Sequence, residues 1–477
     1  MSSKKLLPPK TGDLSDWYTS VIAVADLADY GPAKGTMIIR PYGYAIWERV
    51  VAALDAEIKA KGVDNAYFPL FIPMSLLQKE ADHVEGFAPE LAVVTHGGGE
   101  ELEEKLVVRP TSETIMYQSY AKWVQSWRDL PILINQWNNV VRWEKRTMPF
   151  MRTSEFLWQE GHTAHATHDE SVAMQQWAME AYARVYRDFF AIDGYEGFKS
   201  ISERFAGADN TLTYEALMPS GKALQSCTSH DLGQNFSKPF DISFQDKDGV
   251  NQFVWQTSWG FSTRSIGGLI LAHGDDNGLR LPPKLAPVQV AIVPVRADDQ
   301  ELVHYCTQLH GSLEKAGIRS KLDLRDDESF GFRLNKWEVK GVPLILKIGG
   351  KEVEAKTVSA KRRYDGQELQ FAPGESFAGE VQKELDAIQA MMLQASRDHL
   401  HAETREAKTY DEFKQLLNEH KGFIKVYWND DPDVEKKIKE ETKATSRCKP
   451  LHLQGGEGLD FYTGKPSTDV WLFAQSY

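Results

Sequence analysis

Residues 142–162, RWEKRTMPFMRTSEFLWQEGH, combine charged and aromatic side chains in a spacing that predicts two paired strands. Alternate residues of a strand share one face, so Arg142 and Glu144 share a face of the first strand. The loop KRTMPFM leads to the second strand. If the strands pair as a hairpin, one surface carries guanidinium groups, carboxylates, an imidazole and aromatic rings, from Arg142, Glu144, Arg152, Phe156, Trp158, Glu160 and His162.

This charged surface has two explanations. Hiding such charges from water is costly unless every one finds a partner. The outer face of an antiparallel sheet can carry charges in solvent, but such a face has little reason to interleave them with Phe and Trp. A polar outer face and a binding surface therefore both stay open for an isolated hairpin, and the rest of the chain has to decide.

Length and composition limit the class of protein. Single cores stop growing at about 250–300 residues, so 477 residues predict roughly two to four domains. The formal net charge of −13 argues against a general positive field that coats nucleic acid, although a local basic patch can still hold a few phosphates. The three cysteines, Cys227, Cys306 and Cys448, lie far apart without a CxxC pair, which is typical of a reducing compartment.

The sequence shows no signal for export or membrane insertion. The N-terminal stretch MSSKKLLPPKTGDLSDW is basic but has no apolar core of a signal peptide. No uninterrupted apolar run approaches the length of a membrane span. We therefore expect a cytoplasmic protein without a membrane partner.

The N-terminal region predicts a framework around the hairpin. Apolar residues spaced by three and four predict a helix over residues 14–30. A short strand and a long amphipathic helix follow and end at Gly62; the apolar stripe of this helix needs either the core or a second subunit. Residues 75–106, with HGGGEELEEK at the tip, predict a flexible loop.

Two further segments carry candidate ligand groups. RPTSET places Thr111 and Glu113 on one side of an extended segment, before a helix over residues 115–128. TSWGFSTR continues a predicted strand whose face holds three small residues and then an arginine. Small residues on a strand leave room for a ligand, although they also permit close helix packing. These residues are Ser258, Gly260, Ser262 and Arg264.

Three histidines, His162, His165 and His168, recur at intervals of three and suggest a metal site. On a strand, however, His162 and His165 point to opposite faces, and no cysteine lies nearby. The sequence HDE also fits the start of a helix, with Asp169 and Glu170 in its first turn. We therefore expect no metal at the triplet.

The C-terminal part alternates strands and helices. A proline-rich boundary near residue 285 precedes a small three-layer α/β domain that ends near residue 372. Residues 375–420 are helical and highly charged, and a last α/β unit spans 422–477. A basic cluster on a predicted edge strand either binds phosphates or keeps the edge soluble, and consists of Lys356, Lys361, Arg362 and Arg363.

Taken together, these stretches resemble a class II aminoacyl-tRNA synthetase, and specifically a prolyl-tRNA synthetase of the archaeal and eukaryotic type. The long helix with GVDNAYFP is similar to motif 1 of that class, which builds the dimer interface. RWE and RTSEF are similar to motif 2, and GFSTRSIGG to motif 3, with Arg264 as its arginine. The combination of RPTSET, WQEGHTAH and TSWGFSTR is specific for prolyl enzymes. The resemblance covers nearly the whole chain.

The resemblance implies the fold class and the domains. It implies a mixed α/β (α+β) fold with a six-stranded antiparallel catalytic sheet, flanked by helices, in residues 1–285. An α/β anticodon-binding domain in 286–374 and a small C-terminal α/β domain in 375–477 follow. The terminal Tyr477 matches the C-terminal tyrosine of the family, whose carboxylate reaches towards the active site. The implied assembly is a homodimer.

The resemblance also implies the reaction. The proline carboxylate attacks the α-phosphorus of ATP, with Mg²⁺ as the accompanying ion, and the prolyl group then passes to tRNA(Pro). Charge builds on the α-phosphoryl oxygens, so fixed cations there stabilise the transition state. The implied catalytic residues are Arg142 and Arg264. Phe156 would stack on adenine, and the implied ATP-binding set is Arg142, Arg152, Thr153, Phe156, Gln225, Thr228 and Arg264.

The implied proline site recognises a charged secondary amine with two N–H donors. Thr111 and Glu113 match the residues that accept hydrogen bonds from this amine. The full set is Thr111, Glu113, Arg142, Trp158, Glu160, His162, His230 and Ser262. In the second domain, Glu338 and Arg363 are the candidates for contacting the anticodon.

Two departures from relatives matter. Many relatives bind zinc through four cysteines in the last domain, whereas here Cys448 matches one and Trp428, Asp460 and Thr463 occupy the regions of the others. One thiolate without a histidine cluster cannot build a tetrahedral site, so we expect no zinc. Bacterial-type enzymes carry a large editing insertion between motifs 2 and 3, whereas here catalytic-domain elements fill the interval from His162 to Arg264, and we expect no editing by this chain.

Three alternatives remain. A sister synthetase for threonine, glycine, serine or histidine is disfavoured by RPTSET and GHTAH. A non-catalytic synthetase-like tRNA-binding protein typically loses motif arginines, whereas Arg142, Arg152 and Arg264 are present. A metalloenzyme built on the histidine triplet is the third alternative.

Overall fold

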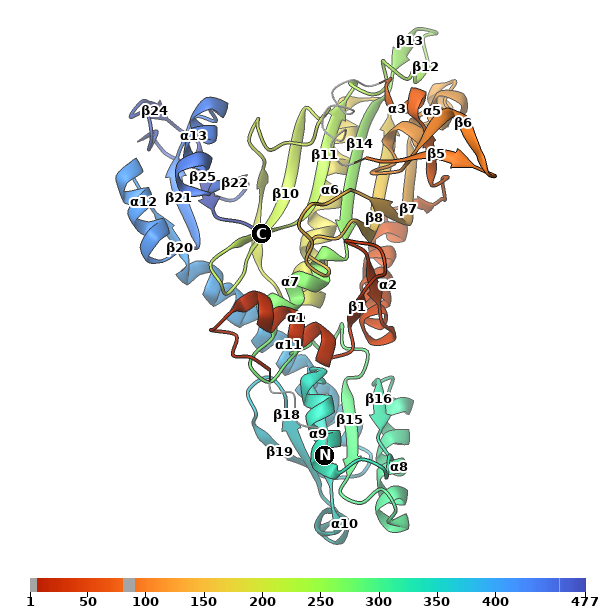
Figure 1. The fold of residues 1–477 in the computed structure, drawn as a ribbon, viewed down its shortest axis with the longest axis vertical. Helices are drawn as coiled ribbons and strands as arrows, with labels where there is room; N and C mark the ends of the chain where they lie inside the picture. Colours follow the sequence, from red (N-terminus) through yellow and green to blue (C-terminus); the bar gives the residue numbers. More distant parts are fainter. Residues whose placement is uncertain (1–6, 80–90, 454) are drawn as a thin grey trace.

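Six antiparallel strands form the centre of the molecule, described here from a computed structural model for residues 7–79, 91–453 and 455–477. Their order is β9-β10-β11-β14-β8-β7 (Figure 1). A short parallel strand, β3 (Asp64–Asn65), extends the sheet beside β7. The predicted fold class, with a six-stranded antiparallel catalytic sheet, is confirmed. The six strands are β7 (Ile132–Val141), β8 (Glu155–His165), β9 (Gly194–Phe198), β10 (Asn210–Leu217), β11 (Ala223–Gly233) and β14 (Trp255–Ser262).

The two faces of this sheet differ in polarity. On one face, Trp259 and Phe261 of β14 contact the ring of Tyr182 on helix α6 (His168–Val185). Because side chains alternate along a strand, the small residues of β14 stand on the opposite, polar face. The apolar face is therefore the core, and it is packed by α6, η3 (Tyr186–Phe190), α7 (Arg264–His273), α1 (Leu14–Val24) and α2 (Pro41–Ala60).

Helix α6 starts where the HDE sequence predicts. The hydroxyl of Thr167 accepts a hydrogen bond from the backbone N–H of Glu170, and the Glu170 carboxylate accepts one from the N–H of Thr167. This capping box satisfies two N–H groups at the helix N-terminus.

Three charged residues of the initial stretch lie outside the strands. Arg142, Glu144 and Arg152 were expected on strand faces, but all three belong to the loop between β7 and β8. The N–H of Arg142 donates to the carbonyl of Ser154 at 2.8 Å, which holds the two ends of the loop together. Arg264, expected at the end of a strand, is the first residue of α7. The arginines thus stand beyond the strand ends, where their direction is not fixed by strand alternation.

The predicted helix over residues 14–30 is too long. Helix α1 ends at Val24, because Asp26 has a φ of 59°, outside the right-handed helical region. The chain then forms β1 (Ala28–Tyr30), which pairs with β2 (Met37–Ile39).

The predicted flexible loop over residues 75–106 is also wrong in part. It contains a hairpin of β5 (Ala92–Gly97) and β6 (Glu100–Val108), and its turn, Gly98–Gly99, has positive φ at both residues. Two glycines suit such a hairpin turn. Residues 80–90 lie outside the described residues. The remaining short elements here are β4 (Phe71–Pro73), α3 (Met74–Leu77), α5 (Glu113–Trp123), η2 (Trp127–Asp129), β12 (Ser243–Gln245) and β13 (Asn251–Phe253).

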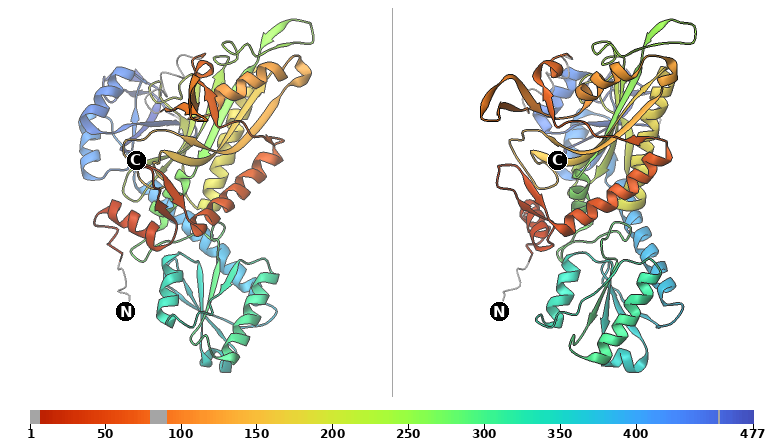
Figure 2. Two further views of the ribbon diagram at one scale, coloured as in Figure 1. Left: turned by 45° about the vertical axis from the view of Figure 1, so that its right-hand side comes forward. Right: turned by 90° about the vertical axis from the view of Figure 1, so that its right-hand side faces the viewer.

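A five-stranded sheet, ordered β16-β15-β17-β18-β19, forms the middle domain below the catalytic sheet (Figure 2). The basic strand β18 is interior, since it pairs with β17 and β19, so the expected basic edge strand is wrong. The long helix α11 (Phe377–Ala402) contributes its first half to this domain's core. The other elements are β15 (Val290–Pro294), α8 (Gln300–Lys315), β16 (Ser320–Leu322), α9 (Phe330–Val339), β17 (Leu344–Ile348), α10 (Gly350–Ala355), β18 (Val358–Arg362) and β19 (Glu368–Phe371).

The C-terminal unit continues the catalytic sheet instead of forming a separate one. Its strand β22 (Thr445–Pro450) pairs with β9, so the combined sheet has eleven strands. Across this junction, the buried Arg447 forms an ion pair with the buried Glu215 of β10 at 2.9 Å. The other elements are β20 (Thr404–Glu406), α12 (Tyr410–Glu419), β21 (Phe423–Tyr427), α13 (Pro432–Thr442), β23 (Gly458–Leu459), β24 (Pro466–Ser467) and β25 (Val470–Ala474).

The chain terminus lies against the catalytic sheet. The N–H of Tyr477 donates to the carbonyl of Ala223 at 3.2 Å, and its hydroxyl bonds to that of Ser220 at 2.8 Å. Among the helices of the described residues, none has the length and apolar character needed to cross a bilayer.

Candidate active site

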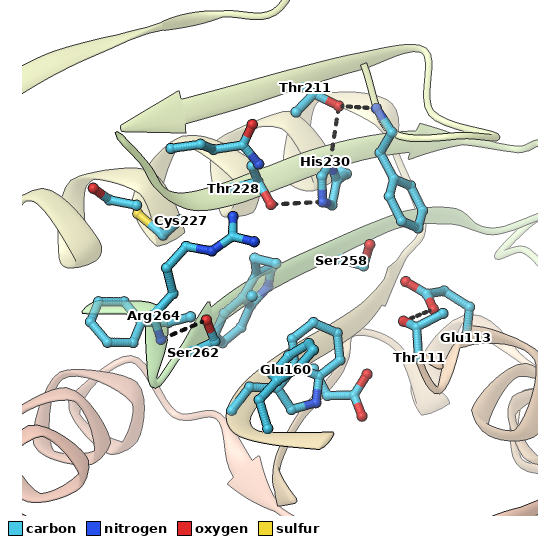
Figure 3. A pocket seen from close by; sticks show the side chains of 18 of the residues that line it. Thr111, Glu113, Glu160, Thr211, Cys227, Thr228, His230, Ser258, Ser262 and Arg264 are labelled. Carbon is cyan, nitrogen blue, oxygen red and sulfur yellow. Dashed lines mark hydrogen bonds between the residues drawn. The ribbon is translucent and has the colours of Figure 1, made fainter. Parts of the chain in front are cut away.

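A cavity of about 270 Å³ lies over the polar face of the sheet. Figure 3 shows Thr111 and Glu113 at one end and Arg264 with Ser262 at the other. An adjoining cavity of about 160 Å³ holds Arg152 and Thr153. Every residue predicted for the catalytic domain borders one of the two. Those that line the larger cavity are Thr111, Glu113, Arg142, Phe156, Trp158, Glu160, His162, Gln225, Thr228, His230, Ser262 and Arg264.

Strand register sets the floor of this cavity. A Cβ atom on Gly260 would lie 3.2 Å from the Trp158 ring, so the bare glycine lets the indole approach the strand. Residues directly opposite each other on neighbouring strands have Cβ atoms about 4.5–5.5 Å apart. The register therefore assembles two cross-strand rows, His162–Ser258–His230 and Glu160–Gly260–Thr228.

Glu160 organises the end of the cavity near Glu113. Its Oε1 accepts hydrogen bonds from Ser112 Oγ at 2.5 Å, Gln136 Nε2 at 3.1 Å and Asn138 Nδ2 at 2.6 Å. Its Oε2 accepts from the N–H of Ser112 at 3.1 Å and from His162 Nε2 at 3.0 Å. Burial favours the neutral acid, but the hydrogen bond and charge of His162 and the other donors outweigh it, so the pKa of Glu160 lies below its ordinary value. Glu160 is therefore a buried carboxylate with its acceptor capacity largely used.

The neighbours of His162 favour its charged form. Burial alone would lower its pKa, but the charge of Glu113 and the hydrogen bond and charge of Glu160 outweigh burial and raise the pKa above its ordinary value. Glu113 starts α5 instead of continuing the expected extended segment, and its carboxylate accepts a hydrogen bond from the Thr111 hydroxyl. This end of the cavity thus contains two carboxyl groups and one imidazole whose charged form they favour.

His230 is neutral, in contrast to His162. Burial, followed by the positive charges of His162 and Arg142, lowers its pKa to about 3. Its two ring nitrogens bond to the hydroxyls of Thr211 at 3.0 Å and Thr228 at 3.1 Å. The hydrogen bonds fix the ring plane, so His230 presents a neutral, immobile wall.

The opposite end of the cavity concentrates positive charge. The pKa of Arg264 is lowered by burial and then by the nearby charges of Arg152 and Arg142. Arg264 Nε donates to the carbonyl of Met151 at 3.0 Å, and Arg142 Nε donates to that of Pro110 at 3.0 Å. Backbone contacts thus fix two guanidinium groups next to each other. Such an arrangement favours an anionic ligand.

Several residues that line the cavity were not predicted. Phe205 stacks on His230 with ring centroids 4.4 Å apart, and Glu203 lies in the same loop. Their sequence context, SERFAGAD, has no strand periodicity that would signal a site. Thr211 could have been found from the strand register, since it lies opposite His230. Ser258, on the small-residue face that the sequence indicated, also lines the cavity. The hydroxyl of Ser258 has no hydrogen-bond partner among the described residues.

The two anticodon candidates lie in the middle domain, away from both cavities. Glu338 forms an ion pair with Lys361 at 2.8 Å and is partly exposed. Arg363 is 4% exposed, and its guanidinium is bonded to Asp275 of the catalytic domain. A buried side chain that is already paired is not available to bases. The burial and pairing of Arg363 argue against a direct contact with the anticodon, whereas Glu338 is the more exposed of the two candidates.

The histidine triplet is dispersed, as expected. His165 bonds to Thr163, and burial lowers its pKa to about 4, while His168 pairs with Asp231 at 2.8 Å. Within the described residues, the group of potential metal ligands that lies close together is Glu113, Glu160 and His162. Glu160 already accepts five hydrogen bonds from protein groups.

The positions around Asp460 that the sequence analysis compared with a zinc site are held together by a carboxylate. Asp460 accepts hydrogen bonds from the N–H groups of Asn429 at 2.9 Å, Tyr462 at 3.0 Å and Thr463 at 2.8 Å. Cys448 is buried, and burial raises the pKa of its thiol, which disfavours the thiolate that zinc requires. These residues do not fit a zinc site.

Family models match three parts of the chain. The tRNA synthetase class II core domain (G, H, P, S and T) matches residues 94–273, and an anticodon binding domain matches residues 289–384. The C-terminal domain of prolyl-tRNA synthetase matches residues 410–477.

Curated proteins and a solved structure are similar over nearly the full length. The proline–tRNA ligase of Chlorobium phaeobacteroides is 50% identical over 99% of both chains. The chloroplastic/mitochondrial proline–tRNA ligase of Arabidopsis thaliana is 47% identical, over 100% of this chain and 89% of that one. The crystal structure of prolyl-tRNA synthetase from Cryptosporidium parvum, complexed with halofuginone and AMPPNP, superposes with a TM-score of 0.95 at 40% identity over 99% of both chains.

We predict that Glu160→Gln lowers the pKa of His162, because a carboxylate contact is lost while burial remains. NMR of selectively ¹³C-labelled histidine rings measures the titration. In the wild type, the raised folded pKa means that His162 contributes stability below its unfolded pKa of about 6.5 and loses it as the pH rises through the folded value.

His165 is the internal control for this titration. With a pKa of about 4, it stays neutral through the titration of His162 in both proteins. A wild-type His162 that titrates below the unfolded value, or an unchanged midpoint in Glu160→Gln, would contradict the assignment.

Proposed function

We propose how this site works from one premise: the chain belongs to the class II prolyl-tRNA synthetases. It is a proline–tRNA ligase, which activates L-proline with ATP to prolyl-adenylate and transfers the prolyl group to tRNA(Pro). The observation that carries the assignment of roles is the charge separation along one cavity, with carboxylates at one end and guanidinium groups at the other.

The arginine end stabilises the first step. A carboxylate oxygen of proline forms a bond to the α-phosphorus, the bond from this phosphorus to the β-bridging oxygen breaks, and pyrophosphate leaves with the electron pair. Negative charge increases on the α-phosphoryl oxygens, where Arg142 would meet it together with the substrate carboxylate. Arg152 and Arg264 would hold the β- and γ-phosphates, and both border the adjoining cavity.

The nucleotide base lies against the rim of the same cavities. Phe156 would stack on adenine, while Gln225 and Thr228 line the larger cavity next to it. The hydroxyl of Thr153 donates a hydrogen bond to the carbonyl of Glu155 at 2.6 Å. Thr153 would therefore shape the turn beside Arg152.

The carboxylate end recognises the proline amine. The ring nitrogen presents two N–H donors, which Glu113 and Thr111 would accept. Trp158 and His162 would wall the ring, His230 would close the far side, and Ser262 would lie beneath it. Since Glu160 already accepts five hydrogen bonds, we assign it to holding Ser112 and His162 in place more than to contacting the substrate.

Magnesium fits the arginine end as the ion of ATP. Mg²⁺ prefers oxygen ligands and is commonly held by one or two carboxylates together with phosphates. Glu144 is the carboxylate that borders the smaller cavity, so it is the protein group that would hold the ion beside the phosphates. The bound ion would neutralise phosphate charge.

We also propose that this chain is of the archaeal and eukaryotic type and does not edit. The interval from His162 to Arg264 is occupied by α6, η3 and strands of the catalytic sheet together with the β12–β13 hairpin. A hydrophobic pocket separates neighbours by only about 1–3 kcal/mol per methylene, so alanine is activated at a low rate. Hydrolysis of alanyl-tRNA by the purified chain would refute the absence of editing.

A homodimer is the proposed assembly. Tyr30, Ile38 and Tyr44, on β1, β2 and α2, are 69%, 51% and 44% exposed, as expected for a face that a second copy covers. We place the protein in the cytoplasm because its three cysteines are buried and free. Glu338 remains the candidate anticodon contact in the middle domain.

The test of the function is amino-acid-dependent ATP–pyrophosphate exchange without tRNA across the twenty amino acids. We expect the strongest exchange with proline and weaker exchange with alanine. Arg142→Ala should lower kcat by about 10²–10³-fold, because it removes a fixed donor to the transition state. Arg128→Ala, which removes an arginine outside both cavities, should leave exchange unchanged.

The other outcomes separate the alternatives. Exchange with threonine, glycine, serine or histidine instead of proline would indicate a sister synthetase. A folded protein that exchanges with no amino acid would be a synthetase-like binding protein.

The dimer is tested by sedimentation velocity at micromolar concentration. We expect Ile38→Glu to shift the dimer towards monomer, because it places a charge in an apolar interface. Val250→Glu is the matched control, since Val250 is 56% exposed on the distant β12–β13 hairpin. A monomeric wild type would contradict the proposal.

A further inference from the structure

Arg363 joins the middle domain to the end of a catalytic helix. Its NH1 donates to Asp275 Oδ2 at 3.0 Å and its NH2 to Asp275 Oδ1 at 2.5 Å, which makes a bidentate pair. Its Nε donates to the carbonyl of Glu338 at 2.9 Å, at the end of α9. Bidentate arginine–carboxylate pairs fix direction as well as distance. The pair therefore ties the end of α9 to the segment that directly follows α7.

The segment around Asp275 is firmly attached to α7. The indole N–H of Trp17 donates to the carbonyl of Asp275 at 3.0 Å. Lys10 Nζ donates to the carbonyls of Leu271 at 2.8 Å and Gly274 at 2.6 Å, so a cation caps the C-terminal end of the helix. A displacement of Asp275 would therefore also displace the last turn of α7.

The other end of α7 carries Arg264. The helix spans Arg264–His273, about 15 Å at 1.5 Å per residue. Its side chains are buried along most of its length, and a Cβ atom on Gly267 would lie 2.5 Å from Met151 Sδ. Met151 also provides the carbonyl that Arg264 Nε binds. A closely packed short helix moves as a unit, so a shift at its C-terminal end reaches the arginine.

We propose that Arg363 is a positioning residue for the ATP phosphates, which acts through Asp275 and helix α7 to fix the place of Arg264. This inference rests on the proposed role of Arg264 in phosphate binding. It also gives a function to the buried arginine that the basic sequence KRR had suggested for tRNA. The middle domain thereby contributes to adenylate formation without touching a substrate.

A second ion pair at the same domain boundary provides a matched control. Lys340 Nζ pairs with Asp26 at 2.9 Å, and the Lys340 carbonyl accepts from the Tyr42 hydroxyl at 3.1 Å. These contacts join the middle domain to the N-terminal segment and to α2, not to α7. If the two ion pairs only hold the domains together, the loss of either basic side chain has the same effect on the KM for ATP. If Arg363 positions Arg264, only its loss changes phosphate binding.

The experiment compares full-length Arg363→Met, Asp275→Asn, their double variant and Lys340→Met in proline-dependent ATP–pyrophosphate exchange. We expect Arg363→Met to raise the KM for ATP by about fivefold, with the KM for proline unchanged. Asp275 also pairs with Arg280 at 2.8 Å, so Asp275→Asn removes a second ion pair. The double variant should therefore resemble Asp275→Asn, because the Arg363–Asp275 contact is already lost in that single variant. Lys340→Met should leave both KM values unchanged. Thermal melting identifies any variant that does not fold, in which case Arg363→Lys, which keeps the charge but loses the bidentate geometry, takes its place.

The outcomes distinguish this inference from the function itself. An unchanged KM for ATP in Arg363→Met, an equal rise for ATP and proline, or the same change in Lys340→Met would overturn the positioning role. A wild type that does not exchange with proline would overturn the proposed function instead. Normal exchange in Arg264→Ala would remove the premise on which the inference rests.

Discussion

The buried carboxylate of Glu160 is the interaction on which the rest of the site depends. Four of its five hydrogen bonds join β8 to β7, through Gln136 and Asn138, and to the segment that carries Thr111 and Glu113, through Ser112. Removing one partner of a buried charged group typically costs about 3–5 kcal/mol, because the remaining groups lose their compensation. The sheet face and the loop above it are thereby locked together, and Glu113 is held at a fixed distance from the floor.

From this anchor the charges of the cavity follow a simple order. Glu113, Glu160 and His162 occupy one end and Arg152 and Arg264 the other, with Arg142 between them, bonded to the carbonyl of Pro110. Proline carries its positive amine and negative carboxylate close together, and ATP adds phosphate charge beyond the carboxylate. The cavity therefore matches the polarity of the two substrates placed end to end. The pKa shifts of the two histidines differ accordingly: Glu113 and Glu160 outweigh burial and raise the pKa of His162, whereas burial, followed by the charges of His162 and Arg142, lowers that of His230.

Period-two patterns made much of the site predictable from the sequence. As expected, one face of β8 carries Trp158, Glu160 and His162. The same face of the neighbouring strand β14 carries Ser258, Gly260 and Ser262. What alternation cannot give is the course of a loop. Arg142 and Arg152 were assigned to strands although they lie between them, and the loop residues Glu203 and Phe205 were missed altogether.

Long-range partners were the second limit. Arg363 looked like a nucleic-acid contact because a basic cluster is the only local signal, and its partner Asp275 lies 88 residues earlier in the chain. The strand β18 was expected at an edge because its basic residues are typical of edge strands. In the structure, β19 follows after a turn and pairs with β18. The resemblance to a family supplied the fold and the residue types, whereas only the coordinates could show which charges neutralise one another.

The central claim is that carboxylates recognise the charged ring nitrogen of proline, and a substrate analogue tests it most directly. Tetrahydrofuran-2-carboxylate has nearly the shape of proline but an ether oxygen, which donates no hydrogen bond, in place of the amine. As a competitor of proline in ATP–pyrophosphate exchange it should bind about a hundredfold or more weakly, because the acceptors of Glu113 and Thr111 would be left without donors. An inhibition constant close to the KM for proline would contradict recognition through the amine.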